Sequence, residues 1–228
     1  MRVVVLTSNA YLRCLPTFAY LFNKHWSAAQ PVMVVRYDGR PPQLPANFEQ
    51  FAVGNQSDFT WSSGLRRFLL SITDDVLLLL LEDYFLDRPV DRAKIAAMIA
   101  MMAAQPAIAK VDLSGDRARF ENVEYPSYQS VALVRSTPDA PFQTSLQAAL
   151  WRRGFLLECL HDSETPWQFE KKGTRRLIER GGALVLGLKH PALHYVNAIG
   201  GEGNMPDTWS LLRFPQPMIV ELQARGLL

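Results

Sequence analysis

Cysteine is scarce in this chain, which contains only two. Cys14 and Cys159 lie far apart and show no CxxC spacing, so the sequence supports neither a disulfide framework nor a zinc-binding pattern. Two isolated thiols in a chain of this size are typical of a reducing compartment. We therefore expect a cytoplasmic protein.

Long apolar runs are also missing. No window reaches the roughly 18 consecutive apolar residues that a membrane-spanning helix needs. The opening residues, MRVVVLTSNAYLR, are too short and become polar too soon for a signal peptide. The sequence thus predicts a soluble protein without a transmembrane segment.

Neither sign of charge dominates, because 24 basic residues face 22 acidic ones and the formal net charge is +2. This balance gives no electrostatic case for a nucleic-acid binder, although it leaves room for a local basic pocket that binds a phosphate. No glycine-rich fingerprint follows the first predicted strand, so neither a Rossmann dinucleotide site nor a P-loop is supported. Internal repeats and low-complexity tracts are absent as well.

What the chain does have is enough apolar material for a substantial core. Of its 228 residues, 48% are apolar and 20% are charged, as in soluble globular proteins. No stretch has the composition of a linker between domains. We expect a single domain over residues 1–228.

The central stretch of the sequence is DDVLLLLLEDYFLD, in which the apolar run Val76–Leu81 leads directly into Glu82 and Asp83. A continuous apolar run this short is typical of a strand that is buried on both faces. Acidic residues that follow such a strand lie at its carboxyl end, the edge where open α/β sheets bind ligands. The sequence thus predicts a pair of acids at the mouth of a sheet crevice.

The first half of the chain alternates strands and helices, which predicts an α/β fold with a mostly parallel central sheet and helices on both faces. The remaining pattern mixes helices with shorter strands. The predicted strands are Arg2–Leu6, Pro31–Tyr37, Phe48–Val53, Val76–Leu81, Ala107–Leu113 and Gln129–Arg135, followed by a strand pair at Ala183–Leu188 and Leu193–Ile199. The predicted helices are Leu12–Trp26, Trp61–Ile72, Asp91–Ala104, Ser145–Leu160, Trp167–Arg180 and a short one in the last ten residues.

Further polar groups follow the early strands. Thr7, Ser8 and Asn9 come after the first predicted strand, Asp38 after the second, and Arg66 lies in a basic helix that precedes the acidic strand end. A nucleotide that lies across the carboxyl edge of a parallel sheet needs acceptors for its base and ribose and a cation near its phosphates. The sequence therefore favours a nucleotide site at this edge.

The order strand, loop, helix, strand and Asp, then WSSGLRRFLL and VLLLLLEDYFLDRPVD, resembles the nucleotide-sugar half of a GT-A-fold glycosyltransferase. In that family a strand ends in an Asp-x-Asp motif that binds the metal and the sugar nucleotide. Here Glu82-Asp83-Tyr84 stands in that place, with Tyr84 instead of the second Asp. A single carboxylate then does the metal work, or the enzyme is metal-independent, or the activity has been lost.

The later run SLQAALWRRGFLLECLHDSETPWQFE is similar to the segment that carries the acceptor side and the catalytic base in these proteins. The resemblance covers roughly residues 1–190. It implies a nucleotide-binding half at 1–115 and an acceptor-side half at 116–228. It also implies transfer of a sugar from a nucleoside diphosphate sugar to a carbohydrate or other hydroxyl acceptor.

Carried over to this sequence, the resemblance assigns roles to the candidate residues. Thr7, Ser8, Asn9 and Asp38 would hold the nucleoside, and Arg66 would help with the base or the diphosphate. Asp83, with Glu82 and a late histidine, His194, would bind a divalent metal, Mn²⁺ or Mg²⁺. Glu170, or else Glu164, would take the proton from the acceptor hydroxyl, and Trp151 and Trp167 would offer flat faces to a sugar ring.

Simpler explanations stay open for these residues. Glu164 and Glu170 fit the first turn of a helix, where a negative charge favours the helix dipole, and the two tryptophans fit a core. A basic group in the second half either forms a solvated helix face or meets a diphosphate, a phosphorylated acceptor or an anionic membrane surface. It comprises Arg152, Arg153, Lys171, Lys172, Arg175 and Arg176.

Two other functions remain as alternatives. A nucleotidyltransferase on a similar sheet would also use metal-bound carboxylates, but it would need a glycine-rich basic loop where this chain has TSNAYLR. A glycosyltransferase-like module without catalytic activity would bind a sugar, a nucleotide or a partner protein, and Tyr84 is the feature that favours it.

Overall fold

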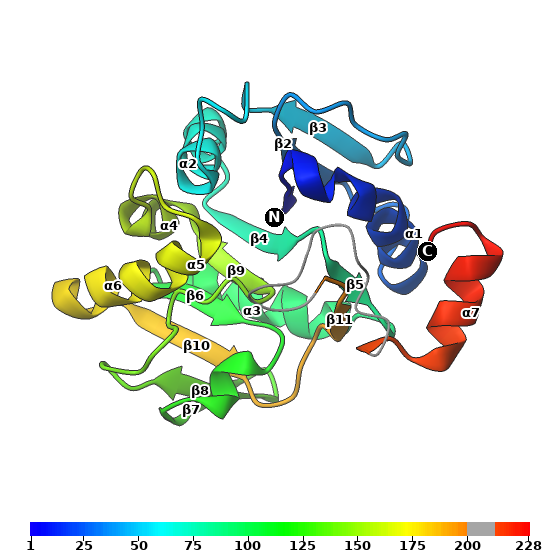
Figure 1. Cartoon of the computed structure of the whole chain (residues 1–228). Helices are drawn as coiled ribbons and strands as arrows, with labels where there is room; N and C mark the ends of the chain where they lie inside the picture. The colour runs from blue at the N-terminus through cyan, green and yellow to red at the C-terminus, as the bar shows by residue number, and fades with distance from the viewer. Residues whose placement is uncertain (200–212) are drawn as a thin grey trace.

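The computed structural model describes residues 1–199 and 213–228 and contains, within these residues, a nine-stranded sheet. Figure 1 shows this sheet running through the whole molecule. Its strands, in spatial order, are β3 (Phe48–Ala52), β2 (Val32–Arg36), β1 (Arg2–Leu6), β4 (Val76–Leu81), β9 (Ala149–Arg152), β6 (Ile108–Asp112), β10 (Leu184–Leu188), β8 (Val131–Ser136) and β7 (Asn122–Tyr128). A separate two-stranded sheet joins β5 (Tyr84–Leu86) to β11 (Tyr195–Asn197).

The strands β3, β2, β1 and β4 are all parallel to one another, and β6 and β10 form a second parallel pair. The strand β9 lies between β4 and β6 and is antiparallel to both. An antiparallel hairpin of β8 and β7 completes the sheet beside β10. The predicted fold, a mostly parallel sheet in an α/β protein, is confirmed.

Alternate residues of the strands enter two different cores, one on each face of the sheet. Leu78 and Leu80 of β4 pack in the first core, whereas Leu77 and Leu79 pack in the second. The prediction that this run is buried on both faces is therefore confirmed. Because the side chains of a strand alternate between faces, a continuous apolar sequence is what a strand between two layers requires.

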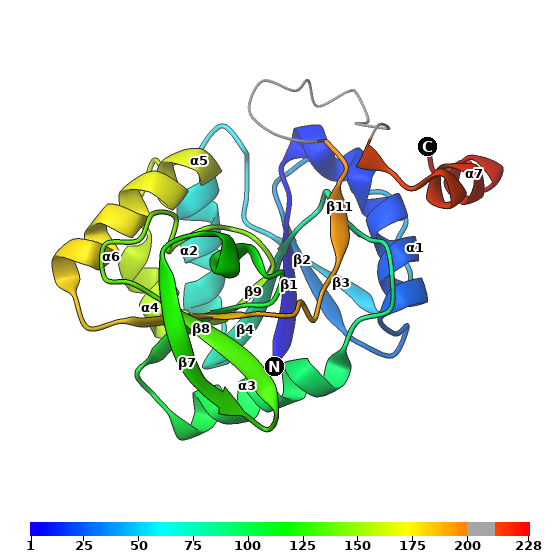
Figure 2. The same cartoon turned by 90° about the horizontal axis from the view of Figure 1, so that it is seen from below.

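Helices cover both faces, as predicted (Figures 1 and 2). Helices α1 (Leu15–His25), α3 (Arg92–Ala104) and α7 (Gln216–Ala224) supply apolar residues to the first core. Helices α2 (Trp61–Ser71), α4 (Arg153–Cys159) and α6 (Thr174–Arg180) supply the second. Within the described ranges, none of the helices has the length and apolar character needed to cross a membrane.

Local signals start several helices where the sequence places them. The carboxylate of Asp91, the predicted first residue of this helix, accepts a hydrogen bond from the Lys94 N–H and caps α3. Thr60 caps α2 by accepting from the Ser63 N–H. Pro16 lies in the first turn of α1, where its missing N–H costs nothing.

The predicted helix Ser145–Leu160 is wrong in its first half, which forms the strand β9 before α4 begins. The backbone of β9 pairs with β4 on one side and β6 on the other. Its residues Ala149, Leu150 and Trp151 are fully buried. Pairing with the strands on both sides thus determines the conformation of this segment, and its local helical spacing does not.

Two further predictions about strands need correction. Residues 121–128, which lie outside every predicted strand and helix, contain β7, which turns back into β8 through Gln129 and Ser130 at positive φ. The two late strands do not pair with each other, because β10 pairs with β6 and β8 while β11 pairs with β5. The sequence is rich in glycine at 200–207, and these residues lie outside the described ones.

Candidate functional site

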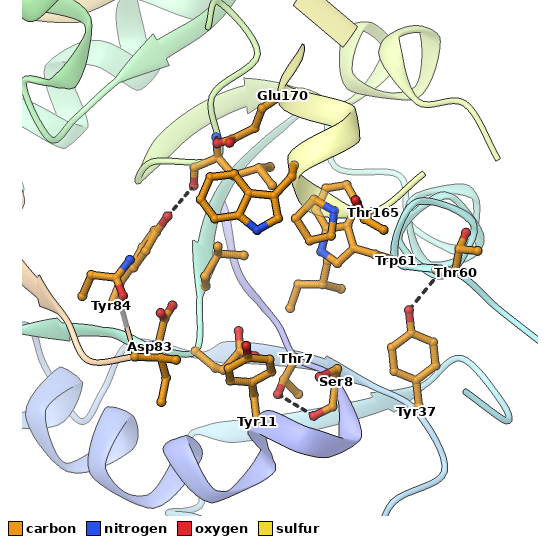
Figure 3. Close-up of a pocket in the computed structure, with 18 of the residues that line it drawn as sticks. Thr7, Ser8, Tyr11, Tyr37, Thr60, Trp61, Asp83, Tyr84, Thr165 and Glu170 are labelled. Carbon is orange, nitrogen blue, oxygen red and sulfur yellow. Dashed lines mark hydrogen bonds between the residues drawn. The ribbon is translucent and has the colours of Figure 1, made fainter. Parts of the chain in front are cut away.

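A cavity of about 680 Å³ lies at the carboxyl edge of the sheet, beyond the ends of β1 and β4. Figure 3 shows Thr7, Ser8, Tyr11 and Asp83 on one side of this cavity and Glu170 and Thr165 on the other. The two sides come from segments that are far apart in the sequence. The sheet edge predicted to bind a ligand is therefore the edge that carries the large cavity.

The acidic side of the cavity is built by neighbouring strands. Leu6 pairs with Leu81, so the residues that follow these two strands, Thr7 and Glu82, meet at the same edge. Burial and the adjacent charge of Asp83 raise the pKa of Glu82, while the Thr7 side chain and a backbone hydrogen bond at Ser8 oppose this shift. Glu82 and Thr7 are both buried and both line the cavity.

Asp83 is the more accessible of the two acids. Burial raises the pKa of Asp83 to about 6, and a hydrogen bond from the Ile199 backbone and the positive charge of Arg213 oppose this shift. No ion pair forms at either Glu82 or Asp83 within the part of the chain that the structure describes. These carboxylates therefore remain available to a bound cation.

Glu170 forms the opposite side. The helix that carries it begins at Pro166, with Thr165 as a capping residue, and passes through a π-helical turn, Phe169–Gly173. The Leu146 N–H donates a 2.7 Å hydrogen bond to Oε1 of Glu170. Burial raises the pKa of Glu170, although this hydrogen bond and the charge of Lys110 hold it down. A carboxylate fixed through one oxygen keeps the other for a ligand.

Aromatic side chains form much of the remaining wall. Tyr37, at the end of β2, donates to the Thr60 carbonyl at 3.0 Å, and Trp61 packs against Phe169. Trp167 lies at the cavity with 46% of its surface exposed, which fits its predicted place beside an acceptor.

Tyr84, in the place of the second motif acid, lies in the cavity wall without offering a metal ligand. Its ring stacks on Tyr195 with centroids 4.4 Å apart, and its hydroxyl donates to the Leu146 carbonyl at 3.4 Å (Figure 3). Burial raises the pKa of Tyr84, so it stays a neutral phenol. Tyr84 thus connects the side of the cavity that carries Asp83 to Leu146, whose N–H donates to Glu170.

Asn9 and Asp38 connect loops and do not line the cavity. The Asn9 amide donates to Asp38 at 2.9 Å, and this bond, with one from the Gln56 N–H, lowers the pKa of Asp38. Asn9 also accepts from the Gly39 N–H, and a Cβ at Gly39 would lie only 2.6 Å from the Asn9 oxygen. Of this cluster, only Gln56 lines the cavity. In this structure Asn9 and Asp38 hold the loops together, and their nucleoside contacts stay a prediction.

Arg66 and His194 also lie outside the cavity lining. Arg66 donates to the Leu160 carbonyl at 2.6 Å and pairs with Asp162 at 3.2 Å, so its charge is used between α2 and the loop after α4. The charges that act on His194 come from Arg88, Asp87 and Lys94, and burial is the main cause of its lowered pKa. The structure therefore places neither residue beside the acids of β4.

Glu164 and Trp151 are corrections to the predicted site. The Arg176 guanidinium donates to both oxygens of Glu164, at 2.8 and 2.6 Å, and this carboxylate does not line the cavity. Trp151 is fully buried in the second core, with the Lys110 ammonium 4.8 Å from its ring centroid. Glu164 is thus occupied by an arginine, and Trp151 offers no face to a sugar.

A divalent metal fits the donor set only in part. Within the described residues, no group of three or more His, Cys, Asp and Glu side chains could hold a metal ion. Glu82 and Asp83 nevertheless provide two hard oxygen ligands, and Mg²⁺ is commonly held by one or two carboxylates together with substrate phosphates. The site therefore fits a metal that arrives with a phosphate-bearing ligand.

Sequence reasoning missed several cavity residues. Tyr37 ends a predicted strand, so the rule that selected Asp38 also applied to it. Gln147 fell inside the wrongly predicted helix, which hid its place in the wall. Tyr11 and Trp61 gave no signal beyond their proximity to predicted strand ends and helix starts.

No protein-family model and no curated protein matches this chain. Among solved structures, the S. aureus TarS 1–349 structure is similar with a TM-score of 0.54 and 13% identity, over 87% of this chain and 61% of that one. A CMP:2-keto-3-deoxy-manno-octonic acid synthetase complexed with CTP gives 0.47 and 12%, over 99% and 98% of the two chains. A UDP-glucose pyrophosphorylase complexed with UDP-glucose gives 0.49 and 8%, over 86% and 93%. At 13% identity, the similarity to the TarS structure bears on the fold alone.

Proposed function

We propose that the cavity binds a nucleoside diphosphate sugar and that the protein transfers the sugar to a hydroxyl acceptor. The observation that carries this proposal is the presence of carboxylates on both sides of one cavity at the carboxyl edge of the sheet. Asp83 and Glu82 stand on one side and Glu170 on the other. A metal-assisted, inverting sugar transfer uses both: one acidic group that binds the metal at the diphosphate and another that lies near the acceptor hydroxyl.

The charge of Arg213 reaches Asp83, but the described lining of the donor side carries no positive charge of its own. None of the described residues that line the cavity is Lys or Arg, and residues 200–212 contain neither in their sequence. A diphosphate bound beside Glu82 and Asp83 therefore needs a cation. A divalent metal held by these two carboxylates would neutralise the phosphate oxygens as charge develops on the leaving group. The side chains of Thr7, Ser8 and Gln56 would face the nucleoside.

On the acceptor side, Glu170 acts as the general base. Its carboxylate takes the proton from the acceptor hydroxyl while the acceptor oxygen forms a bond to the anomeric carbon. The bond from that carbon to the diphosphate oxygen breaks, and the nucleoside diphosphate leaves with the bonding electrons. Trp167, an exposed lining residue of the same cavity, offers the flat surface on which an acceptor ring stacks.

Nucleotidyl transfer is the second candidate, because it would use the same two acids on the β4 side. It has less support, since a triphosphate carries more negative charge and the described cavity wall offers no basic side chain to bind it. A binding module without activity is the third candidate, and only turnover separates it from the first.

The test of the proposed function is thermal unfolding against nucleoside diphosphates, nucleoside triphosphates and nucleotide sugars, each with Mn²⁺ or with EDTA. A ligand at one hundred times its Kd adds about 2.7 kcal/mol of stability. We expect a metal-dependent shift with one nucleotide sugar that disappears in Asp83→Asn. The matched control is Asp162→Asn, whose exposed carboxylate lies outside the cavity.

Turnover is then followed as release of nucleoside diphosphate. Glu170→Gln should retain the donor-induced shift and lose about 10²- to 10⁴-fold in rate, the usual contribution of a positioned base. A shift with a triphosphate and none with nucleotide sugars would support nucleotidyl transfer. Binding without turnover in the wild-type protein would identify the inactive module, and no shift with any ligand would refute the proposal.

A further inference from the structure

Lys110 is a charged residue in the middle of the sheet, and the proposed mechanism does not yet use it. It lies on β6, is 2% exposed, and pairs in register with Trp151 of β9. Of the lysines, all of which the structure describes, it is the one that is buried. Burying an ammonium is costly, so its partners should reveal what it does.

The ammonium of Lys110 bonds to a loop. Its Nζ donates to the Ser145 carbonyl at 2.6 Å and to the Gln143 carbonyl at 3.4 Å. Among the described residues it forms no ion pair with a carboxylate. Lys110 therefore holds the backbone of residues 143–147, which we name the wall segment because its last two residues line the cavity.

The wall segment has no regular secondary structure, and side chains hold it in place. The Thr144 N–H donates to the Thr174 hydroxyl at 3.1 Å, and the Thr144 hydroxyl donates to the Glu170 carbonyl at 3.1 Å. The Ser145 hydroxyl donates to Asp116 at 3.4 Å. The next backbone N–H, that of Leu146, is the donor that fixes the Glu170 carboxylate.

Lys110 also acts on Glu170 through its charge. The positive charge of Lys110 lowers the pKa of Glu170, and the charge of Asp116 raises it. Burial lowers the pKa of Lys110 to about 8, whereas Asp112, Asp116 and Glu170 raise it and Arg117 lowers it further. These are the charged groups that act on Lys110 from β6, from the turn Asp116–Arg119 and from the π-helical turn.

We propose that Lys110 is a positioning residue for Glu170: it holds the wall segment so that the Leu146 N–H meets the Glu170 carboxylate. This inference rests on the proposed role of Glu170 as the base. Lys110 does not touch the cavity, so it acts through the wall segment and through its field.

Two variants separate these effects. Lys110→Met removes both the N–H donors and the charge, whereas Lys110→Gln removes the charge and keeps an N–H donor on a shorter side chain. Both variants should raise the pKa of Glu170, measured by ¹³C NMR of the side-chain carboxyl, with the signal assigned by its loss in Glu170→Gln. Only Lys110→Met should also weaken the protection of the Leu146 N–H against hydrogen exchange.

In the transfer reaction, Lys110→Met should lower kcat roughly 10²-fold, as expected when a catalytic group loses its position, with little change in the KM of the donor. The acidic limb of the kcat profile should move to higher pH, because Glu170 then binds its proton more tightly. Adding Lys110→Met to Glu170→Gln should cost nothing further. The control is Lys189→Met, which removes a surface lysine that pairs with Glu124.

An unchanged Glu170 pKa with an unchanged pH profile would overturn the proposal. The proposal would also be overturned if Lys110→Met lowered kcat by the same factor in the wild type and in Glu170→Gln. Failure of both Lys110 variants to fold would assign Lys110 to stability alone and would also overturn it. The NMR titration needs no substrate. A shifted Glu170 pKa in a protein that transfers no sugar would keep the role of Lys110 and reject the proposed function.

Discussion

Two acidic sites that the sequence offers as functional candidates differ sharply in the structure. Glu164 is 3% exposed, and both its oxygens accept from Arg176. Glu82 and Asp83 are also largely withdrawn from water, yet among the described residues neither forms an ion pair. Burial alone therefore does not mark a functional acid. An acid with its own cation holds the fold together, and an acid without one is free to bind a ligand.

The largest expected loss of stability in this comparison comes from removing Arg176, the arginine that pairs with Glu164. Arg176→Met leaves the Glu164 carboxylate buried and unpaired, which should cost about 3–5 kcal/mol in the free energy of unfolding. Urea denaturation measures it, with the exposed neighbour Arg175→Met as control. Equal stabilities of the two variants would show that the ion pair contributes little, and the contrast with Asp83 would then fail.

Asp83 should respond in the opposite direction. Its folded pKa of about 6 lies above the ordinary value of 3.8, so the ionised form destabilises the fold at neutral pH. Asp83→Asn should therefore stabilise the ligand-free protein by about 1–3 kcal/mol in EDTA. Urea denaturation at pH 7.5 checks this gain beside Asp162→Asn. A destabilised variant would mean that Asp83 holds the fold as Glu164 does.

Lys110 gives the comparison a third case, a buried charge whose ammonium donates to two backbone carbonyls and lies over the Trp151 ring. Its folded pKa of about 8 lies below the ordinary 10.5, so between these values the unfolded chain keeps a proton that the native state has released. Stability should then rise with pH above 8, by at most about 1.4 kcal/mol per pH unit for this group, and show no such slope below 8.

The difference between wild type and Lys110→Met isolates this contribution, because other groups titrate in both proteins. Urea midpoints between pH 7 and 9.5 are the measurement. A difference that does not change with pH would show that Lys110 keeps its ordinary pKa inside the sheet.

The smallest expected effect concerns the tryptophans. Trp167 is 46% exposed, so Trp167→Ala should change the free energy of unfolding by no more than about 0.5 kcal/mol. Trp151→Ala, in contrast, should lose about 3–5 kcal/mol, because that ring is fully buried. Chemical denaturation compares the two directly. A large loss at Trp167 would make it a packing residue and remove its proposed place at the acceptor.

Features that depend on one short segment could be predicted from the sequence. The run Val76–Leu81 is sufficient to indicate a strand buried on both faces, and the acids that follow it must then lie at its carboxyl end. The strand at Ala149–Arg152 could not be found in this way, since its spacing fits a helix and only β4 and β6 on either side make it a strand.

The same limit applies to the site. The sequence correctly predicted that one edge of the sheet carries Thr7, Ser8, Glu82 and Asp83. Each of them follows the end of a strand, and the two strands, β1 and β4, are parallel neighbours. The sequence could not show that Arg176 forms an ion pair with Glu164 or that the Lys110 ammonium lies over the ring of Trp151. Those partners come from elements that meet only after the chain folds.

The position of β9 has a consequence for how this protein reaches its native state. The strands β4 and β6 both precede β9 in the chain, yet each pairs with it and not with the other. During synthesis, β4 and β6 each keep an unpaired edge until residues 149–152 have left the ribosome. Unpaired strand edges can hydrogen-bond to other chains and cause aggregation. Fragments that end before residue 149 should therefore aggregate, and the full chain should collapse cooperatively only once this late strand closes the middle of the sheet.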